Sequence, residues 1–223
     1  MNKTILIICA HPDDEVIGCG GTIAKLSKSG FKINVLFLAD GESSRDGFNN
    51  KSNLIEKRKK NSIKALKVLG CNAINFLDYQ DNRLDSIELL EIVKSVEKYI
   101  TLYRPSIIFT HYINDLNIDH QITSKAVITA CRPQPNYPVK ELLFFETCSS
   151  TEWNLSESFM PNYFIDISKT LTLKKRALNC YKDEMRPYPH PRSIKSIENL
   201  SYYRGSTVGC NAAEAFIIGR KID

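Results

Sequence analysis

The chain has 223 residues and a formal charge of +5, from 30 Lys and Arg against 25 Asp and Glu. Hydrophobic residues make up 43% and charged residues 25%, a globular composition that excludes disorder, collagen and coiled coil. The first apolar run, 5–10, is shorter than the ~20 residues that span a bilayer, and no small-residue cleavage site follows it, so we expect a soluble, unprocessed, cytoplasmic protein without stable membrane insertion.

The first half of the chain alternates between apolar runs and helical stretches. An uninterrupted apolar strand is predicted at 4–10, followed by the polar turn HPDDE (11–15) and a helix that ends at Gly30. Further strands are predicted at 33–39, 73–77 and 106–110, and further helices at 53–69, 86–101 and 120–131. Polar loops at 40–50 and 111–119 follow two of these strands. The pattern predicts an α/β fold with a mostly parallel central sheet and helices on both faces.

From residue 133 the pattern changes. A Pro-rich connection precedes a predicted strand at 141–147, and helices are expected at 169–181 and 193–204. We interpret 133–223 as a C-terminal elaboration of a core at about 1–132, so that 1–223 is one domain.

Composition also limits the kinds of partner that the protein is expected to bind. The seven cysteines include no CxxC pair, which favours reduced, buried thiols over a disulfide frame or a Cys-rich zinc site. The basic excess is modest and has only one local run, 57–60, so a nucleic-acid partner is not expected and a small anionic substrate is favoured. A homo-oligomer stays open.

Three of the four histidines lie in or beside two polar loops that should open at the same sheet edge. His11, Asp13 and Asp14 follow the first strand, and His120 follows Asp119 at the start of a later helix. Two His and one Asp match the ligands of a catalytic zinc, and the second carboxylate could accept a proton from its water. The alternative is that the acids only satisfy a helix N-terminus.

These residues carry a family resemblance. AHPDDE (10–15) after a hydrophobic strand, with NDLNIDHQIT (114–123) further on, resembles the PIG-L/LmbE family of zinc-dependent de-N-acetylases. SSTEW (149–153), PHPRS (189–193), YRGS (203–206) and AEAF (213–216) extend the resemblance to the branch associated with surface-polysaccharide and amino-sugar biosynthesis.

The resemblance implies a Rossmann-like fold and hydrolysis of the acetamide of an amino sugar, nucleotide-linked or otherwise anionic. By position, His11, Asp14 and His120 would bind one Zn²⁺ per chain, and Asp13 would be the general base. Many members carry a second His three residues before the last ligand, where it stabilises the oxyanion; here that position is Asn117. Asn117 could donate a neutral hydrogen bond there, or His111 could supply a charged group, unless His111 is a capping or exposed side chain.

Substrate contacts are less constrained by the sequence. Arg58 and Arg83 are the first candidates, because QDNRLD (80–85) follows the third strand. Arg45, Arg192, Arg204 and His190 are further candidates, although a surface or structural role is the favoured interpretation for each of them alone. Gly20 and Gly21 do not follow a strand directly as in a dinucleotide site, so they are attributed to close helix packing.

Two rival functions remain at this point. A nucleotide-binding or non-catalytic Rossmann-type module would leave the His/Asp cluster unexplained. A zinc amidase acting on a thiol precursor or an antibiotic amide would keep the metal and change the substrate.

Overall fold

The structure is a computed structural model that describes residues 3–44 and 51–222. In these residues one sheet contains the strands β1 Thr4–Cys9, β2 Lys32–Ala39, β3 Ala73–Tyr79, β4 Ile107–His111, β5 Glu141–Phe145, β6 Tyr163–Asp166 and β7 Ala213–Lys221. The helices are α1 Asp14–Lys28, α2 Lys51–Leu69, α3 Leu89–Tyr103, α4 Ile118–Ala130, α5 Leu171–Leu178 and α6 Ile194–Ser206. Short 3₁₀ turns occur at Leu84–Ser86, Thr151–Trp153 and Asn179–Tyr181.

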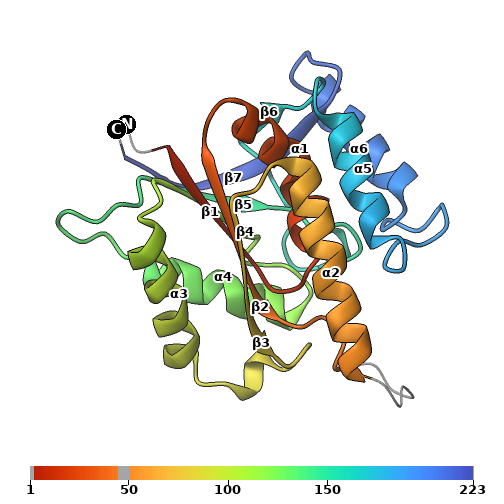
Figure 1. Cartoon of the computed structure of the whole chain (residues 1–223). Coiled ribbons are helices and arrows are strands. Elements are labelled where there is room, and N and C mark those ends of the chain that lie inside the picture. The colour runs from red at the N-terminus through yellow and green to blue at the C-terminus, as the bar shows by residue number, and fades with distance from the viewer. Residues whose placement is uncertain (1–2, 45–50, 223) are drawn as a thin grey trace.

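The strand order is β3-β2-β1-β4-β5-β7-β6, and β1 to β5 are parallel. This confirms the predicted α/β class with a mostly parallel sheet. Strands β1 and β2 are buried almost throughout because helices cover both faces of the sheet. Figure 1 shows α3 and α4 on one face, and α1, α2, α5 and α6 on the other. Each face has its own apolar core.

The order in which strands are added to the sheet reverses at β1 and β4. From β1 the chain moves outward through β2 and β3, and it then returns to β4 on the other side of β1. Such a reversal opens a crevice beyond the carboxyl ends of the two strands, and this crevice is where open α/β sheets bind ligands.

The C-terminal part contains two strands that the sequence analysis did not predict. β7 is antiparallel to both β5 and β6 and lies between them. Its first four residues are buried without the alternation that marks a half-exposed strand, and β6 is only 4 residues long. The predicted helix at 169–181 is α5 followed by a 3₁₀ turn, and α6 begins after its N-cap, Ser193.

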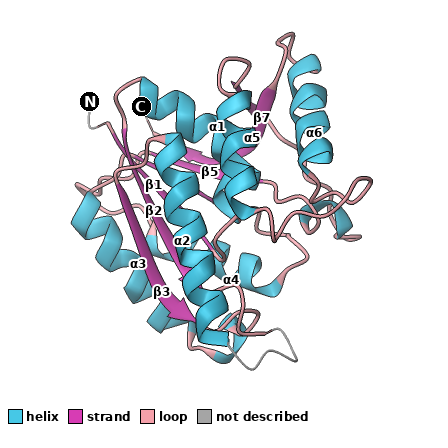
Figure 2. Ribbon diagram, turned by 45° about the vertical axis from the view of Figure 1, so that its right-hand side comes forward, coloured by secondary structure: helices cyan, strands magenta, loops and turns pink. Residues whose placement is uncertain are grey.

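The packing explanation for the glycines is confirmed. A Cβ placed on Gly21 would lie 2.7 Å from Ile167 Cδ1, and one on Gly20 would lie 3.3 Å from Lys174 Cγ of α5. Figure 2 shows α1, α2 and α5 side by side on one face of the sheet. Among residues 3–44 and 51–222, every helix is too short or too polar to cross a bilayer.

Candidate metal centre and active site

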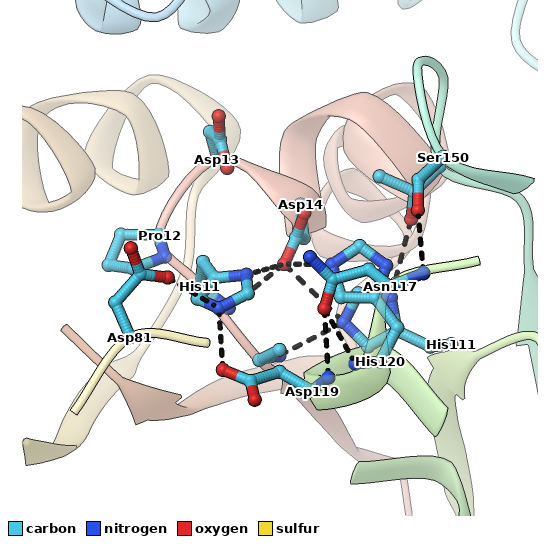
Figure 3. A network of polar contacts seen from close by, with 12 residues as sticks. His11, Pro12, Asp13, Asp14, Asp81, His111, Asn117, Asp119, His120 and Ser150 are labelled. Carbon is cyan, nitrogen blue, oxygen red and sulfur yellow. Dashed lines mark hydrogen bonds and ion pairs between the residues drawn. The ribbon is translucent and has the colours of Figure 1, made fainter. Parts of the chain in front are cut away.

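The loops after β1 and β4 meet at the crevice between these two strands. His11 and Asp14 come from the first loop and the start of α1, and His120 lies in the first turn of α4. All three side chains are buried. Figure 3 shows them converging on one point, as the strand-end argument predicts.

The neighbouring carboxylates of Asp13 and Asp14 face different surroundings (Figure 3). Asp14 Oδ2 lies 3.5 Å from His11 Nδ1 and 3.4 Å from His120 Nε2. Asp13, the N-cap residue of α1, has φ 136° and ψ −27°, a region that non-glycine residues rarely adopt. This backbone conformation turns its carboxylate away from the histidines, toward Arg58 and Arg192.

The donor set fits a divalent metal ion. One nitrogen of His11, one oxygen of Asp14 and one nitrogen of His120 lie within 4.8 Å of one another. Among the described residues, Asp14 Oδ1 is buried and accepts no hydrogen bond, which is costly unless a cation is nearby. Two imidazoles and one carboxylate suit zinc and similar ions, with a position left for water.

A second layer of carboxylates orients both histidines. The Nε2 atom of His11 lies 3.0 Å from Asp119 Oδ2 and 3.0 Å from Asp81 Oδ1, which leaves Nδ1 facing Asp14. The Nδ1 atom of His120 lies 3.0 Å from Asp115 Oδ1, which leaves Nε2 facing Asp14. Acidic partners behind metal-binding histidines fix their tautomer and ring orientation.

His11, Asp81 and Asp119 form a second acidic group whose ligand atoms are equally close. Both oxygens of Asp119 already accept hydrogen bonds, from the backbone N–H groups of Leu84 at 3.0 Å and Asn82 at 2.8 Å. We therefore assign this group to the support of His11.

His111 does not face the substrate side. It is fully buried at the end of β4, and among the described residues it is outside the cavity lining. Its Nε2 atom accepts the backbone N–H of Ala10 at 2.9 Å, so Nδ1 carries the proton and faces Thr147 Oγ1 at 3.3 Å. Burial and the neighbouring His120 lower the pKa of His111 to about 4. These contacts favour the alternative in which His111 is a neutral structural imidazole that ties the end of β1 to β4.

Asn117 lines the cavity, and both the oxygen and the nitrogen of its side-chain amide take part in hydrogen bonds. It is the N-cap residue of α4, and its Oδ1 atom accepts the backbone N–H groups of Asp119 at 2.8 Å and His120 at 3.3 Å. This capping starts the helix two residues earlier than predicted and places His120 in the first turn. The Nδ2 atom donates to Asn82 Oδ1 at 3.0 Å.

Two guanidinium groups flank Asp13. Arg58 Nη2 lies 3.2 Å from Asp13 Oδ1, and its other nitrogens contact Glu42, Glu184 and the carbonyl of Pro12, so Arg58 is fully engaged. Arg192 Nη1 lies 3.4 Å from Asp13 Oδ2, and its Nε donates to Ser149 Oγ at 2.9 Å. Burial raises the pKa of Asp13, and the two arginines act in the opposite direction.

The remaining predicted contacts lie elsewhere. Arg83 is exposed and outside the cavity lining, and Arg204 forms a bidentate ion pair with Glu146 beside a second cavity. His190 packs edge-on against Trp153, with ring centroids 5.8 Å apart, and contributes to neither lining among the described residues. Arg45 lies outside the described residues.

The cavity in front of the cluster has a volume of about 150 Å³ and a polar wall. It is lined by His11, Asp13, Gly41, Ser44, Arg58, Asp81, Asn82, Asn117, His120 and Arg192. Sequence reasoning missed Asp81, Asn82 and Ser44. It had placed the segment after β3 at this edge, and that position was the available signal, but it selected Arg83 as the side chain facing the site.

The mostly parallel α/β sheet carries a buried His/Asp cluster that could hold a metal ion, at the point where the strand order reverses. The chain belongs to the PIG-L family of de-N-acetylases: residues 6–131 match the family model described as GlcNAc-PI de-N-acetylase. It is 33% identical over 186 residues to the uncharacterized deacetylase YaiS of Escherichia coli, covering 81% of this chain and 91% of the relative. It is 30% identical over 219 residues to the diacetylchitobiose deacetylase of Thermococcus kodakarensis, covering 95% and 81%.

The fold is shared with solved deacetylases. The structure of N,N'-diacetylchitobiose deacetylase from Pyrococcus horikoshii superimposes with a TM-score of 0.79 at 23% identity, over 98% of this chain and 84% of that one.

Proposed function

We propose that this protein is a zinc-dependent hydrolase that removes the N-acetyl group from an amino sugar. One observation carries the proposal: Asp14 joins the two histidines, while the adjacent Asp13 lines the cavity between two guanidinium groups. One carboxylate is thus available to a metal ion and the other to a proton, the division of labour that amide hydrolysis needs.

In the proposed site, His11, Asp14 and His120 hold the ion. When bound, zinc polarises the acetamide carbonyl and lowers the pKa of water toward ~7. Asp81, Asp115 and Asp119 place carboxylate oxygens within 3.0 Å of the imidazole nitrogens that face away from Asp14, which favours the tautomers that leave the other nitrogens for the ion.

Asp13 is the proposed general base and acid. It accepts a proton from the attacking water and then delivers it to the nitrogen of the leaving amine. Arg58 and Arg192 favour the ionised carboxylate before attack. Asn117 Nδ2 is the proposed neutral donor to the developing oxyanion, through the second of its two N–H groups, since the first donates to Asn82.

A sugar substrate is supported by the cavity wall. Ser44, Asp81, Asn82 and Asn117 offer hydroxyl, carboxylate and amide groups suited to sugar hydroxyls. Arg192, with a side chain 23% exposed, is the proposed contact for an anionic group on the substrate, because Arg58 is already engaged by carboxylates.

The test is acetate release from a panel of free, nucleotide-linked and lipid-linked N-acetyl sugars by the metal-loaded protein. The panel also includes an N-acylated antibiotic and an N-acetylated thiol precursor. Release from at least one N-acetyl sugar is the expected outcome. Activity confined to the antibiotic or thiol compounds would replace the sugar proposal with an amidase acting on another amide.

A further inference from the structure

The turn formed by residues 181–184 lies next to the start of α1, although it belongs to the C-terminal part of the chain. The N–H of Glu184 donates to the carbonyl of Tyr181 at 2.8 Å, so both side chains project from one turn. Tyr181 is fully buried and Glu184 nearly so. Both residues lie beyond residue 131, where the match to the family model ends.

Tyr181 reaches the backbone of Asp13 through Glu15. Its hydroxyl donates to Glu15 Oε1 at 2.7 Å, and Glu15 Oε2 accepts the backbone N–H of Asp13 at 3.0 Å. Glu15 is fully buried, so this pair of hydrogen bonds is shielded from water. The bond to the Asp13 N–H holds a residue whose φ of 136° is unfavourable and persists only where surrounding contacts enforce it.

Glu184 reaches the carboxylate of the same residue through Arg58. Its Oε2 atom lies 2.5 Å from Arg58 Nη1, and Arg58 Nη2 lies 3.2 Å from Asp13 Oδ1. Arg58 Nε also donates to the carbonyl of Pro12 at 2.7 Å. The guanidinium therefore contacts both the backbone just before Asp13 and the Asp13 carboxylate. Glu42 also contacts Nη1, at 3.1 Å, but Glu184 is the nearer of the two carboxylates, so its loss would leave Arg58 and the Asp13 carboxylate less tightly fixed.

We propose that Tyr181 and Glu184 are positioning residues for Asp13: one turn of the C-terminal part fixes the backbone of this residue through Glu15 and its carboxylate through Arg58. The proposal rests on the proposed function, in which Asp13 transfers the proton. Among the described residues, the cavity lining includes Asp13 and Arg58 but neither Tyr181 nor Glu184, so the two act through other side chains.

The kinetic test uses Tyr181→Phe and Glu184→Gln. Each substitution keeps the shape of the side chain and removes the hydroxyl or the charge. A displaced general base slows the chemical step, so kcat is expected to fall about 10- to 100-fold while KM and metal content stay unchanged. Tyr202→Phe and Glu198→Gln are matched controls, because Tyr202 donates to Glu198 at 2.9 Å on the exposed side of α6. Both controls should retain wild-type kcat.

A double-mutant cycle separates positioning from a general loss of stability. In the Asp13→Asn background the base is already absent, so Tyr181→Phe should cause no further loss of kcat. An equal fold-loss in both backgrounds would show that Tyr181 acts independently of Asp13 and would overturn the proposal. If Tyr181→Phe does not fold, Glu184→Gln is carried through the same cycle with the same criterion.

A readout without turnover keeps this inference separate from the proposed function. Crystal structures of Glu184→Gln and Tyr181→Phe should show Asp13 with a changed φ or with its carboxylate displaced from Arg58. If the wild type releases no acetate from any panel member, the proposed function fails, while the position of Asp13 still decides the inference. An unchanged Asp13 in both variant structures, or unchanged kcat in both variants, would overturn it.

Discussion

Asp13 and Asp14 show how adjacent residues of one type acquire separate tasks. Asp14 lies among histidines, and Asp13 lies between guanidinium groups, because the backbone at Asp13 has a positive φ. Local sequence cannot distinguish the two carboxylates by spacing alone. Their roles depend on partners from α2 and from residue 192, far away in the sequence.

The two aspartates should therefore respond differently to the same substitution. Asp13→Asn is expected to retain metal while kcat falls by roughly 10²–10⁴, because the amide cannot accept a proton. Asp14→Asn should lose metal and activity together, because it removes the charged ligand. Metal content by atomic absorption, measured beside kcat, checks both. Full turnover by Asp13→Asn would exclude it as the base.

The carboxylate behind His120 can be tested at the same scale. Asp115→Asn should weaken metal affinity about 10- to 100-fold, because the acid fixes the ring through Nδ1. Asp166→Asn is a matched control, since Asp166 is an exposed residue that bonds Ser168. Competition with a chromophoric chelator measures the affinity. Equal affinity in the two variants would argue against a role for Asp115.

At the scale of elements, Asn117 caps the start of α4 and is also the proposed oxyanion donor, so a substitution has to separate the two roles. Asn117→Asp keeps an oxygen for the cap and removes the Nδ2 donor, so kcat should fall without loss of stability or metal. Asn117→Ala should lower kcat and also cost ~1 kcal/mol of unfolding free energy. Ser193→Ala, at the N-cap of α6, should cost similar stability at unchanged kcat. If Asn117→Asp keeps wild-type kcat, the residue is a cap only.

The strand β7 is connected to α1 by buried hydrogen bonds and to α5 by a buried ion pair, all through Glu214. Glu214 accepts the backbone N–H groups of Gly21 at 2.9 Å and Thr22 at 2.7 Å, and it pairs with Lys174 at 2.6 Å. Glu214→Ala should destabilise the protein by ~3–5 kcal/mol, because it leaves a buried ammonium group without its partner. Urea unfolding measures the loss. Glu198→Ala removes the partner of exposed Lys175 and should change stability little, because water screens that pair.

At the scale of the whole molecule, metal and folding should be coupled. The ligands of the proposed ion come from two distant loops that only the native fold brings together, so saturating metal at 100 times Kd should add ~2.7 kcal/mol of stability. Treatment with a chelator is expected to lower Tm, and added zinc should restore it, in scanning calorimetry. Asp14→Asn should show no such response. If neither the chelator nor added zinc changes the Tm of the wild type, the proposed metal centre would be contradicted.

The parallel half of the sheet was accessible to sequence reasoning because its strands are continuous apolar runs. The same rule brought His11, Asp14 and His120 to one edge, since parallel strands all end there. β7 and β6 were not accessible, because an antiparallel return depends on tertiary pairing more than on local pattern. The site shows the same limit. The sequence placed the loop after β3 at this edge, but packing decides that Asp81 and not Arg83 points into the cavity.

The place of β7 also matters for the order in which the protein is made. The ribosome delivers residues 213–221 after every other strand and helix of the structure, yet β7 lies between β5 and β6 and supplies Glu214 to α1. Until then, β6 has no partner and the helix that carries Asp14 lacks one of its anchors. A growing chain would therefore expose unpaired strand edges until residues 213–221 have been made, and such edges favour aggregation over folding unless chaperones protect them.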